Sequence, residues 1–366
     1  MTPKERVNAA IRHREPDRVP RDFSAEPAVW SRLLQKLQTD DREAILRHFD
    51  IDCRVISYDS GIFLHRRNDE ASSPASDAKS WKREVAPGLF VDVWGAKRCR
   101  VKNDWGEYEE LCEYPLANAQ SVNDLEQFRW PVPDWWDFSE VPRVAEEIGH
   151  RGYYHLRYRV GSIFETAWSL RGFDRFLMDL VLNPGMTQYI MERILEVHLE
   201  NLRQVMSFAG NAIDMIYTYD DVAHQNGLLI SPALWRKTIR PFQRRLFEKA
   251  KEYGKPIMLH CCGAVRPLLP EWIDMGLDVI NPIQPLAANM NFSELKEEFG
   301  NRLAFHGGID IQELLPRGTP QEVSETIRKT CQILGKQGGY ILAPAHHIQA
   351  DTPLENVFAL YDGAPV

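Results

Sequence analysis

The hydrophobic pattern divides the chain into an irregular first half and a regular second half. In the second half, short apolar runs typical of β-strands alternate with longer segments that begin with helix start signals. The predicted strands start about 20 to 45 residues apart, which is the length of one βα unit. They are Ile213–Tyr219, Pro256–His260, Asp278–Asn281, Arg302–His306 and Gly339–Leu342.

Proline and capping residues mark where helices begin. A serine–proline pair predicts a helix over Ser231–Gly254, with a break at Pro241. Threonine followed by proline and, three residues later, by glutamate predicts a capped helix start at Thr2, Thr319 and Thr352. We therefore expect helices to begin at these four points.

The first half contains fewer regular elements. Strands are predicted at Val55–Tyr58 and Tyr153–Val160. Between them we expect a mobile polar loop, a small hairpin and an extended segment packed on a surface, at Asn68–Ser80, Ala86–Arg100 and Trp130–Trp136. We interpret residues 1–150 as an elaborated part of one domain that spans residues 1–366, with regular βα units over residues 151–366.

Length and composition narrow the classes of protein. The 366 residues permit two or three domains, but one large α/β barrel also fits, and 44% hydrophobic residues can form a sizeable core. The formal net charge of −8 argues against non-specific nucleic-acid binding. Neither a membrane span nor a secretory signal is expected. Six cysteines are too few for a disulfide framework, so we expect a reducing cytoplasm, with Cys53, Cys99 and Cys112 structural and without partners.

Polar and metal-binding side chains follow all five predicted strands of the second half. In a parallel barrel the catalytic groups lie at the carboxyl ends of the strands. Five such groups in register are hard to obtain from packing alone, so we expect a site there. Strand by strand, the residues are Asp220, Asp221 and Gln225; His260, Cys261 and Cys262; Asn281; His306; and His346 and His347.

The pair formed by His260 and Cys262 is the most specific of these signals. Residues i and i+2 of a strand point to the same side, which places Cys261 on the opposite side. An imidazole and a thiolate on one face predict a zinc pair that needs a third ligand, for which His346 and His306 are candidates. The alternative is a buried cysteine beside a core histidine.

Three carboxylates are candidates for the same site, at the mouth of the barrel formed by the carboxyl ends of the strands. Asp220 and Asp221 suit a general acid, a partner of the metal ligands or a substrate contact, with a helix-terminal charge or a solvated turn as the alternative. Glu165 follows a predicted strand, and its alternative is a carboxylate at a helix N-terminus.

Several stretches together resemble the uroporphyrinogen decarboxylase superfamily, which also includes zinc-dependent, corrinoid-linked methyltransferases. The resemblance extends over nearly the whole chain and is densest from Tyr153 onward. It implies a (β/α)8 barrel and, by analogy, a homodimer. The stretches are Glu15–Pro20, Asp220–Asp221, Leu229–Pro232, His260–Gly263, Phe305–Asp310 and Asp351–Val357.

Two chemistries compete within that superfamily. Its decarboxylases use no metal and bind substrate carboxylates with an arginine-rich N-terminal segment. This chain retains Arg18 and Arg21 but lacks the clustered pair, and Asp59 is only a loose match to the decarboxylase aspartate. Its methyltransferases use His-x-Cys and a late cysteine. Here His346 stands where that cysteine falls, which implies a ligand set of His260, Cys262 and His346.

The sequence therefore favours a zinc-dependent methyltransferase that acts between a thiol acceptor and either a corrinoid on a partner protein or a methylated small molecule. Asp220, Asp221 and His306 are its predicted catalytic groups. The predicted substrate contacts are Gln225, Glu165, Asn281 and Asp59. The alternatives are a decarboxylase, in which Asp59 or Asp221 stabilises a protonated intermediate, and a non-catalytic corrinoid- or tetrapyrrole-binding protein.

Overall fold

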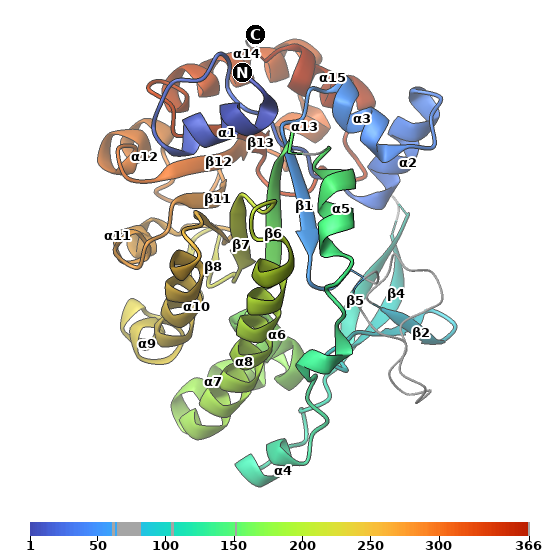
Figure 1. The fold of residues 1–366 in the computed structure, drawn as a ribbon, viewed down its shortest axis with the longest axis vertical. Helices are drawn as coiled ribbons and strands as arrows, with labels where there is room; N and C mark the ends of the chain where they lie inside the picture. Colours follow the sequence, from blue (N-terminus) through green and yellow to red (C-terminus); the bar gives the residue numbers. More distant parts are fainter. Residues whose placement is uncertain (61–62, 64–81, 104–105, 151, 365–366) are drawn as a thin grey trace.

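The computed structural model describes residues 1–60, 63, 82–103, 106–150 and 152–364 (Figure 1). The polar loop predicted at Asn68–Ser80 lies outside the described residues. None of the described helices is both long enough and apolar enough to cross a bilayer.

A curled sheet of seven parallel strands forms the centre of the molecule. All seven strands predicted from apolar runs are present, with ends that differ by a few residues. In sheet order they are β1 (Cys53–Ser57), β6 (His155–Gly161), β7 (Met215–Tyr219), β10 (Ile257–His260), β11 (Val279–Ile283), β12 (Ala304–Ile309) and β13 (Tyr340–Pro344).

A short N-terminal segment closes the sheet into a barrel. The amide of Leu342 in β13 donates to Pro20 O, and the amide of Asp22 donates to Leu342 O, both at 2.8 Å. On its other side, the amide of Asp52 donates to Arg21 O at 2.9 Å, beside the start of β1. Residues 20–22 thus occupy the eighth strand position between β13 and β1. The predicted (β/α)8 barrel is confirmed, with its first strand reduced to a few residues.

The interior of the barrel is apolar at one end and polar at the other. Helix α1 (Pro3–Ile11), which begins with the predicted capping box at Thr2, covers the end where the strands start. Asp22 and Arg157 are buried further along the interior, toward the carboxyl ends. The apolar cluster beneath them consists of Val7, Ile11, Cys53, Met215, Met258, Val279, Ala304 and Ile341.

Helices surround the sheet, and their starts mostly follow the capping signals. The predicted break near Pro241 separates α9 from α10, and the capping box at Thr319 begins α14. The box predicted at Thr352 is wrong, because Pro353 is the N-cap of α15 and the threonine side chain is buried one residue earlier. The helices are α2 (Pro27–Lys36), α3 (Arg42–His48), α4 (Val122–Glu126), α5 (Val141–Ile148), α6 (Phe164–Arg171), α7 (Phe173–Leu182), α8 (Pro184–Ala209), α9 (Pro232–Thr238), α10 (Arg240–Glu252), α11 (Leu269–Asp274), α12 (Phe292–Phe299), α13 (Leu314–Arg317), α14 (Pro320–Leu334) and α15 (Leu354–Asp362), with short 3-10 turns at Pro133–Trp135 and Arg266–Leu268.

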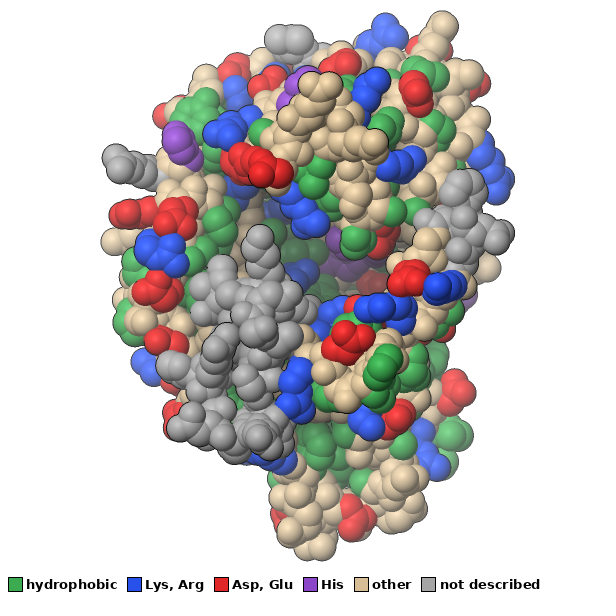
Figure 2. Space-filling model, turned by 90° about the vertical axis from the view of Figure 1, so that its right-hand side faces the viewer, with side chains coloured by type: hydrophobic (Ala, Val, Ile, Leu, Met, Phe, Trp, Pro, Cys, Tyr) green, Lys and Arg blue, Asp and Glu red, His purple; other side chains and the backbone are tan. Residues whose placement is uncertain are grey.

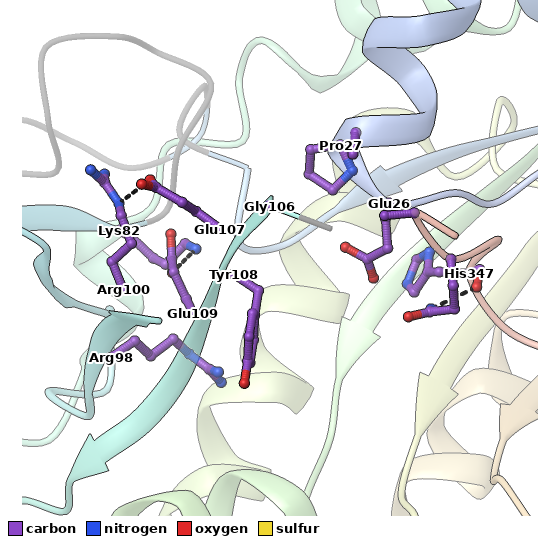
Figure 3. A pocket seen from close by; sticks show the side chains of 13 residues that line it. Glu26, Pro27, Lys82, Arg98, Arg100, Gly106, Glu107, Tyr108, Glu109 and His347 are labelled. Carbon is purple, nitrogen blue, oxygen red and sulfur yellow. Dashed lines mark hydrogen bonds and ion pairs between the residues drawn. The ribbon is translucent and has the colours of Figure 1, made fainter. Parts of the chain in front are cut away.

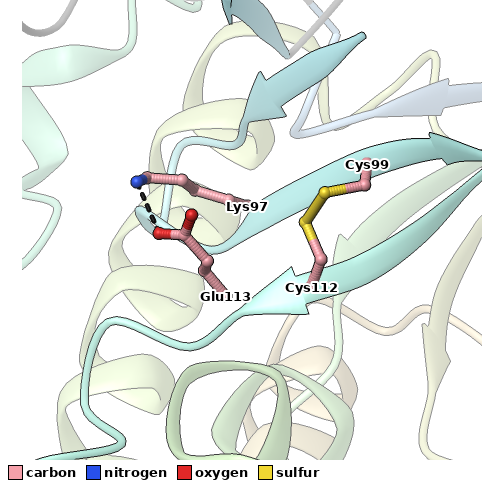
Figure 4. Close-up of a disulfide and its surroundings, with 4 residues drawn as sticks. All are labelled: Lys97, Cys99, Cys112 and Glu113. Carbon is pink, nitrogen blue, oxygen red and sulfur yellow. Dashed lines mark hydrogen bonds and ion pairs between the residues drawn. A yellow bond between two sulfur atoms is a disulfide. The ribbon is translucent and has the colours of Figure 1, made fainter.

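A second sheet of four antiparallel strands projects from the first half of the chain (Figure 1). It contains β2 (Arg83–Ala86), β3 (Leu89–Val91), β4 (Lys97–Asn103) and β5 (Gly106–Glu113), and β3 with β4 forms the predicted hairpin. A disulfide joins Cys99 to Cys112 across β4 and β5 (Figure 4), so the prediction that these cysteines lack partners is wrong. Cys99 is paired with Glu110, and Cys112 lies at the register shift between Leu111 and Glu113, an irregularity that cysteine spacing alone does not reveal.

The segment Trp130–Trp136 is only partly extended, because residues 133–135 form a 3-10 turn that starts at a proline. Trp130 and Trp136 are buried. The predicted packing of this segment is therefore confirmed, and its extended conformation is not.

Candidate metal centre

Three side chains at the carboxyl ends of the strands bring their ligand atoms together. One ligand atom each from His260, Cys262 and His346 lies within 4.8 Å of the others, and all three residues are half-buried. Cys262 Sγ lies 3.4 Å from His260 Nε2. Among the described residues, this is the one group of three or more His, Cys, Asp or Glu side chains with the spacing of a metal site.

The turn after β10 explains why these two neighbours face one another. His260 ends the strand, and the amide of Cys262 then donates to Asp221 Oδ1 at 2.7 Å. Cys261 is buried on the other side, where its Sγ accepts from the Val222 amide. At Gly263 the backbone has φ 92°, and a Cβ there would lie 2.4 Å from the His224 carbonyl oxygen, so only glycine fits.

The electrostatics of the three donors suit a cation. Burial, together with Asp221 and Glu165, raises the pKa of the Cys262 thiol. Burial, with His260 and His347 nearby, lowers the pKa of His346 to about 3, so the ring is neutral and offers a lone pair at neutral pH. Two imidazole nitrogens and one sulfur beside carboxylates form a donor set that fits Zn²⁺ with one open position.

Two of the predicted carboxylates lie at this mouth. Glu165, in the first turn of α6, accepts from the Asp221 amide at 3.0 Å. Burial, with Asp221 and Asp220 nearby, raises the pKa of Glu165 well above its ordinary value. Asp221 is the more exposed of the two, and its Oδ1 lies 3.8 Å from His260 Nε2.

Asp220 lies where the alternative interpretation places it, as a charge at the N-terminus of a helix. Its carboxylate is buried and accepts from the amides of residues 163–165 at the start of α6, and from Gln243 Nε2 at 3.0 Å. Burial raises the pKa of Asp220 to about 6. The prediction of a catalytic role does not fit this position, because both oxygens are occupied in fixing the helix that presents Glu165.

A line of buried hydrogen bonds runs from His260 into the barrel. Asn281 Oδ1 lies 2.6 Å from His260 Nδ1, and Asn281 Nδ2 contacts His306 Nδ1. His306 Nε2 lies 2.8 Å from Asp22 Oδ2, which also accepts from Arg157 Nη2 at 2.6 Å. His306, the other candidate for third ligand, therefore lies behind the donor set rather than in it.

The remaining predicted contacts lie around the mouth. Gln225 Nε2 donates to Gln284 Oε1 at 3.3 Å, and the same oxygen accepts from the Gly263 amide at 2.9 Å. Asp59 accepts from Arg159 Nη2 at 3.1 Å and, with Glu165, lines a cavity of about 110 Å³.

A larger cavity of about 1010 Å³ lies between the antiparallel sheet and the mouth (Figure 3). His347, Glu26 and Tyr108 line it from different elements, and Figure 3 shows His347 and Glu26 on one side and the β5 side chains on the other. In the space-filling view, this face is hollowed, with histidine in the depth of the hollow (Figure 2). His347 in this lining is the chain neighbour of His346 in the donor set.

Sequence reasoning missed Asp22, Arg157, Arg159 and Gln284. Gln284 had a signal, because it follows Asn281 at the end of the same strand. No such signal marked Asp22, because the strand segment of residues 20–22 is too short to show a hydrophobic pattern. Neighbouring Arg21, in contrast, is buried away from the mouth, and its guanidinium donates to the Ala364 carbonyl.

Comparisons with known proteins agree with this geometry. The family model described as uroporphyrinogen decarboxylase (URO-D) matches residues 147–364. A methylated-thiol–coenzyme M methyltransferase of Methanosarcina mazei is 33% identical over 131 residues, which are 36% of this chain and 32% of that protein. The chain thus matches about a third of the length of that relative.

Two further similarities extend over almost the whole chain. The methylcobamide:CoM methyltransferase MtbA of Methanosarcina acetivorans is 21% identical over 97% of this chain and 95% of its own length. A solved structure of a methyltransferase from Methanosarcina mazei superposes with a TM-score of 0.66 at 18% identity, over 99% of this chain and 98% of that one. That structure supports the fold.

Proposed function

The chain belongs to the uroporphyrinogen decarboxylase family, in its methyltransferase branch, and from this premise we propose that it is a zinc-dependent methyltransferase with a thiol acceptor. The observation behind the proposal is the donor set of His260, Cys262 and His346, whose ligand atoms lie within 4.8 Å of one another. Relatives named for methyl transfer from methylated thiols and methylcobamide support the reaction class.

His260, Cys262 and His346 would hold the zinc ion and leave one position for the acceptor. Zinc supplies Lewis acidity, which keeps a bound thiol ionised at neutral pH and so makes it the nucleophile. Asp221, whose Oδ1 lies 3.8 Å from His260 Nε2, is placed to accept the proton that the acceptor thiol loses. Beside it lies the carboxyl of Glu165, whose pKa is raised by burial and by the nearby Asp221 and Asp220.

In the proposed reaction the acceptor sulfur forms a bond to the methyl carbon, and the bond from that carbon to the donor breaks. With a corrinoid donor, the electron pair of the cobalt–carbon bond stays on cobalt. We propose that the donor is a corrinoid presented by a partner protein or a methylated small molecule, and that it enters through the cavity of about 1010 Å³. A homodimer and a cytoplasmic setting stay predictions.

The positions of Arg18 and Arg21 argue against the decarboxylase alternative. Arg18 contacts Asp52, and Arg21 turns toward backbone carbonyls away from the mouth, so neither is placed for a polycarboxylate substrate. The carboxylate of Asp59 is paired with Arg159. In the N-terminal segment, the side chain buried in the barrel interior is that of Asp22. This acidic side chain would repel the carboxylate groups of a decarboxylase substrate.

Metal analysis and a methyl-transfer assay test the proposal together. We expect about one zinc per chain, and demethylation of methylcobalamin by the purified protein when a small thiol is added, with the thioether as product. In a parallel anaerobic incubation, uroporphyrinogen should keep its carboxylates. A wild-type protein that binds no metal, or one that removes carboxylates from uroporphyrinogen stoichiometrically, would overturn the proposal.

A further inference from the structure

We infer that Asp22 is a positioning residue that fixes, through His306 and Asn281, which ring nitrogen of His260 bears the proton. The effect on zinc binding rests on the proposed function, whereas the line of hydrogen bonds does not depend on it. Three side chains from the first strand position, β12 and β11 connect the barrel interior with one nitrogen of His260.

The Asp22 end of this line has a fixed charge. The carboxylate is buried, and burial would raise the pKa of Asp22, but Arg157 and His306 outweigh it and hold that pKa well below its ordinary value. Arg157 Nη2 donates to Oδ2 at 2.6 Å. An ionised carboxylate only accepts hydrogen bonds, so the partner at 2.8 Å, His306 Nε2, must be the donor.

The proton positions beyond Asp22 then follow one from another. Burial lowers the pKa of His306, so its ring is neutral, and with Nε2 protonated its Nδ1 is an acceptor. The partner of that nitrogen must therefore be the amide Nδ2 of Asn281, which turns Oδ1 toward His260. Oδ1 accepts only, so His260 Nδ1 bears the proton.

The last step frees the nitrogen that faces the other donors. With its proton on Nδ1, His260 has a lone pair on Nε2, 3.4 Å from Cys262 Sγ. If the amide of Asn281 were reversed, the proton would lie on Nε2 and block this position. Loss of a hydrogen-bond partner of a metal-binding histidine lowers metal affinity about 10–100-fold. Asp22 would act on His260 indirectly, through His306 and Asn281.

The variant Asp22→Ala removes the acceptor at the origin of the line. Arg157 Nη2 and His306 Nε2 both contact Oδ2 of Asp22, so an asparagine oxygen in that place would still accept from both, whereas alanine offers no acceptor. Nothing then fixes the proton of His306 on Nε2, and both orientations of the Asn281 amide become available. In metal-free protein labelled with ¹⁵N-histidine, we expect His260 to lose its tautomer preference, and zinc affinity to fall about 10-fold.

A second substitution should restore the original state in the same background. In Asp22→Ala/Asn281→Asp, the carboxylate introduced at position 281 accepts from both His260 Nδ1 and His306 Nδ1, so the His260 tautomer and zinc affinity should recover. Asn281→Leu leaves the pair of Asp22 and Arg157 intact, which protects folding, and should lose the tautomer preference. Assignment of the His260 signals comes from His260→Gln.

Three outcomes decide the matter. A wild-type tautomer and wild-type zinc affinity in both Asp22→Ala and Asn281→Leu would overturn the inference. Failure of the double variant to recover the tautomer, with the chain folded by circular dichroism, would also overturn it. A wild-type chain that binds no zinc would overturn the proposed function alone, since the nuclear magnetic resonance measurement on metal-free protein still decides the inference.

Discussion

The barrel mouth and the antiparallel sheet of β2 to β5 are built on different principles. At the mouth, buried side chains from distant parts of the sequence contact one another, as His306 and Asp22 do across 284 residues. In the sheet, partners are close in sequence and exposed, as with Lys102 and Glu107, whose side chains are 80% and 45% exposed. The disulfide in that sheet joins residues only 13 apart.

The difference indicates where each kind of perturbation should act. Chemistry at the mouth depends on closure of the whole barrel, whereas the sheet depends on local pairing and one covalent bond. Exposed ion pairs contribute about 0–1 kcal/mol each, so we expect the disulfide to contribute more to the stability of the sheet than any one of them. A change in one region should leave the other nearly intact, and four predictions test this separation.

Loss of the Cys262 thiol should have the largest effect. Cys262→Ala removes the only sulfur of the donor set, and we expect zinc affinity to fall by orders of magnitude while the melting temperature of the metal-free protein changes little. Elemental analysis after dialysis is the measurement. The matched control is Cys261→Ser, which alters a thiol that faces away and should keep its metal. Equal metal in wild type and Cys262→Ala would refute the assignment.

His346 provides the second test, on the mouth alone. His346→Ala should lose zinc on dialysis, because one of three ligands is removed, and His346→Cys should retain it. His347→Ala should keep most of its metal, since that ring contacts Ser24 and lines the larger cavity. Competition with a chelator measures the affinities. Zinc held by His346→Ala as tightly as by wild type would move the third ligand elsewhere.

Removal of the disulfide should act on the sheet alone. Cys112→Ser opens the loop between Cys99 and Cys112, and we expect a loss of about 3 kcal/mol in the free energy of unfolding with zinc content unchanged. Urea unfolding under non-reducing conditions is the measurement. Cys99→Ser should give the same loss, and adding reductant to wild type should reproduce it. A fall in zinc content would show that the two regions are coupled.

Asp92 gives the smallest and most pH-dependent effect. It follows β3, accepts from the amides of Trp94 and Ala96, and has a pKa raised by burial to about 6. The folded state thus binds this proton more tightly than the unfolded chain. The penalty for ionising Asp92 is absent below about pH 4 and complete above about pH 6.

Asp92→Asn should therefore stabilise the protein by about 1–2 kcal/mol at pH 8. The advantage over wild type should shrink toward pH 4, where both side chains are neutral. Urea unfolding at the two pH values measures it. The same difference at both pH values would contradict the assigned burial, whereas zinc affinity at pH 8 should equal that of wild type.

Sequence patterns predicted the barrel better than its surroundings. Buried parallel strands are continuous apolar runs, so β7, β10, β11, β12 and β13 and the groups at their ends could be identified directly. The pair of His260 and Cys262 follows from this, because the ends of parallel strands meet at one edge. The strand pattern left His346 and His306 open as third ligand, and the family resemblance implied His346. For Asp220 the sequence left a catalytic group and a helix-terminal charge open, because its position at a strand end does not reveal that its side chain turns toward α6.

The first half was less predictable for physical reasons. The segment at residues 20–22 is too short for a hydrophobic period, so neither barrel closure nor the role of Asp22 was visible. The sheet of β2 to β5 is exposed on much of its surface, which weakens alternation, and its disulfide depends on register. The capping box predicted at Thr352 is absent because the same sequence pattern also occurs where the threonine side chain is buried just before the helix.

Closure by an N-terminal segment also affects how the protein is made. Residues 20–22 emerge early from the ribosome, but their partner Leu342 emerges more than 300 residues later. At about 5–20 residues per second, at least about 15 s separates the two during synthesis. Throughout that interval the nascent barrel has an open seam, because the N-terminal segment lacks its neighbour β13. A polypeptide released before β13 is complete would leave the backbone amide of Asp22 without its partner Leu342, so closure of the barrel is coupled to completion of the chain.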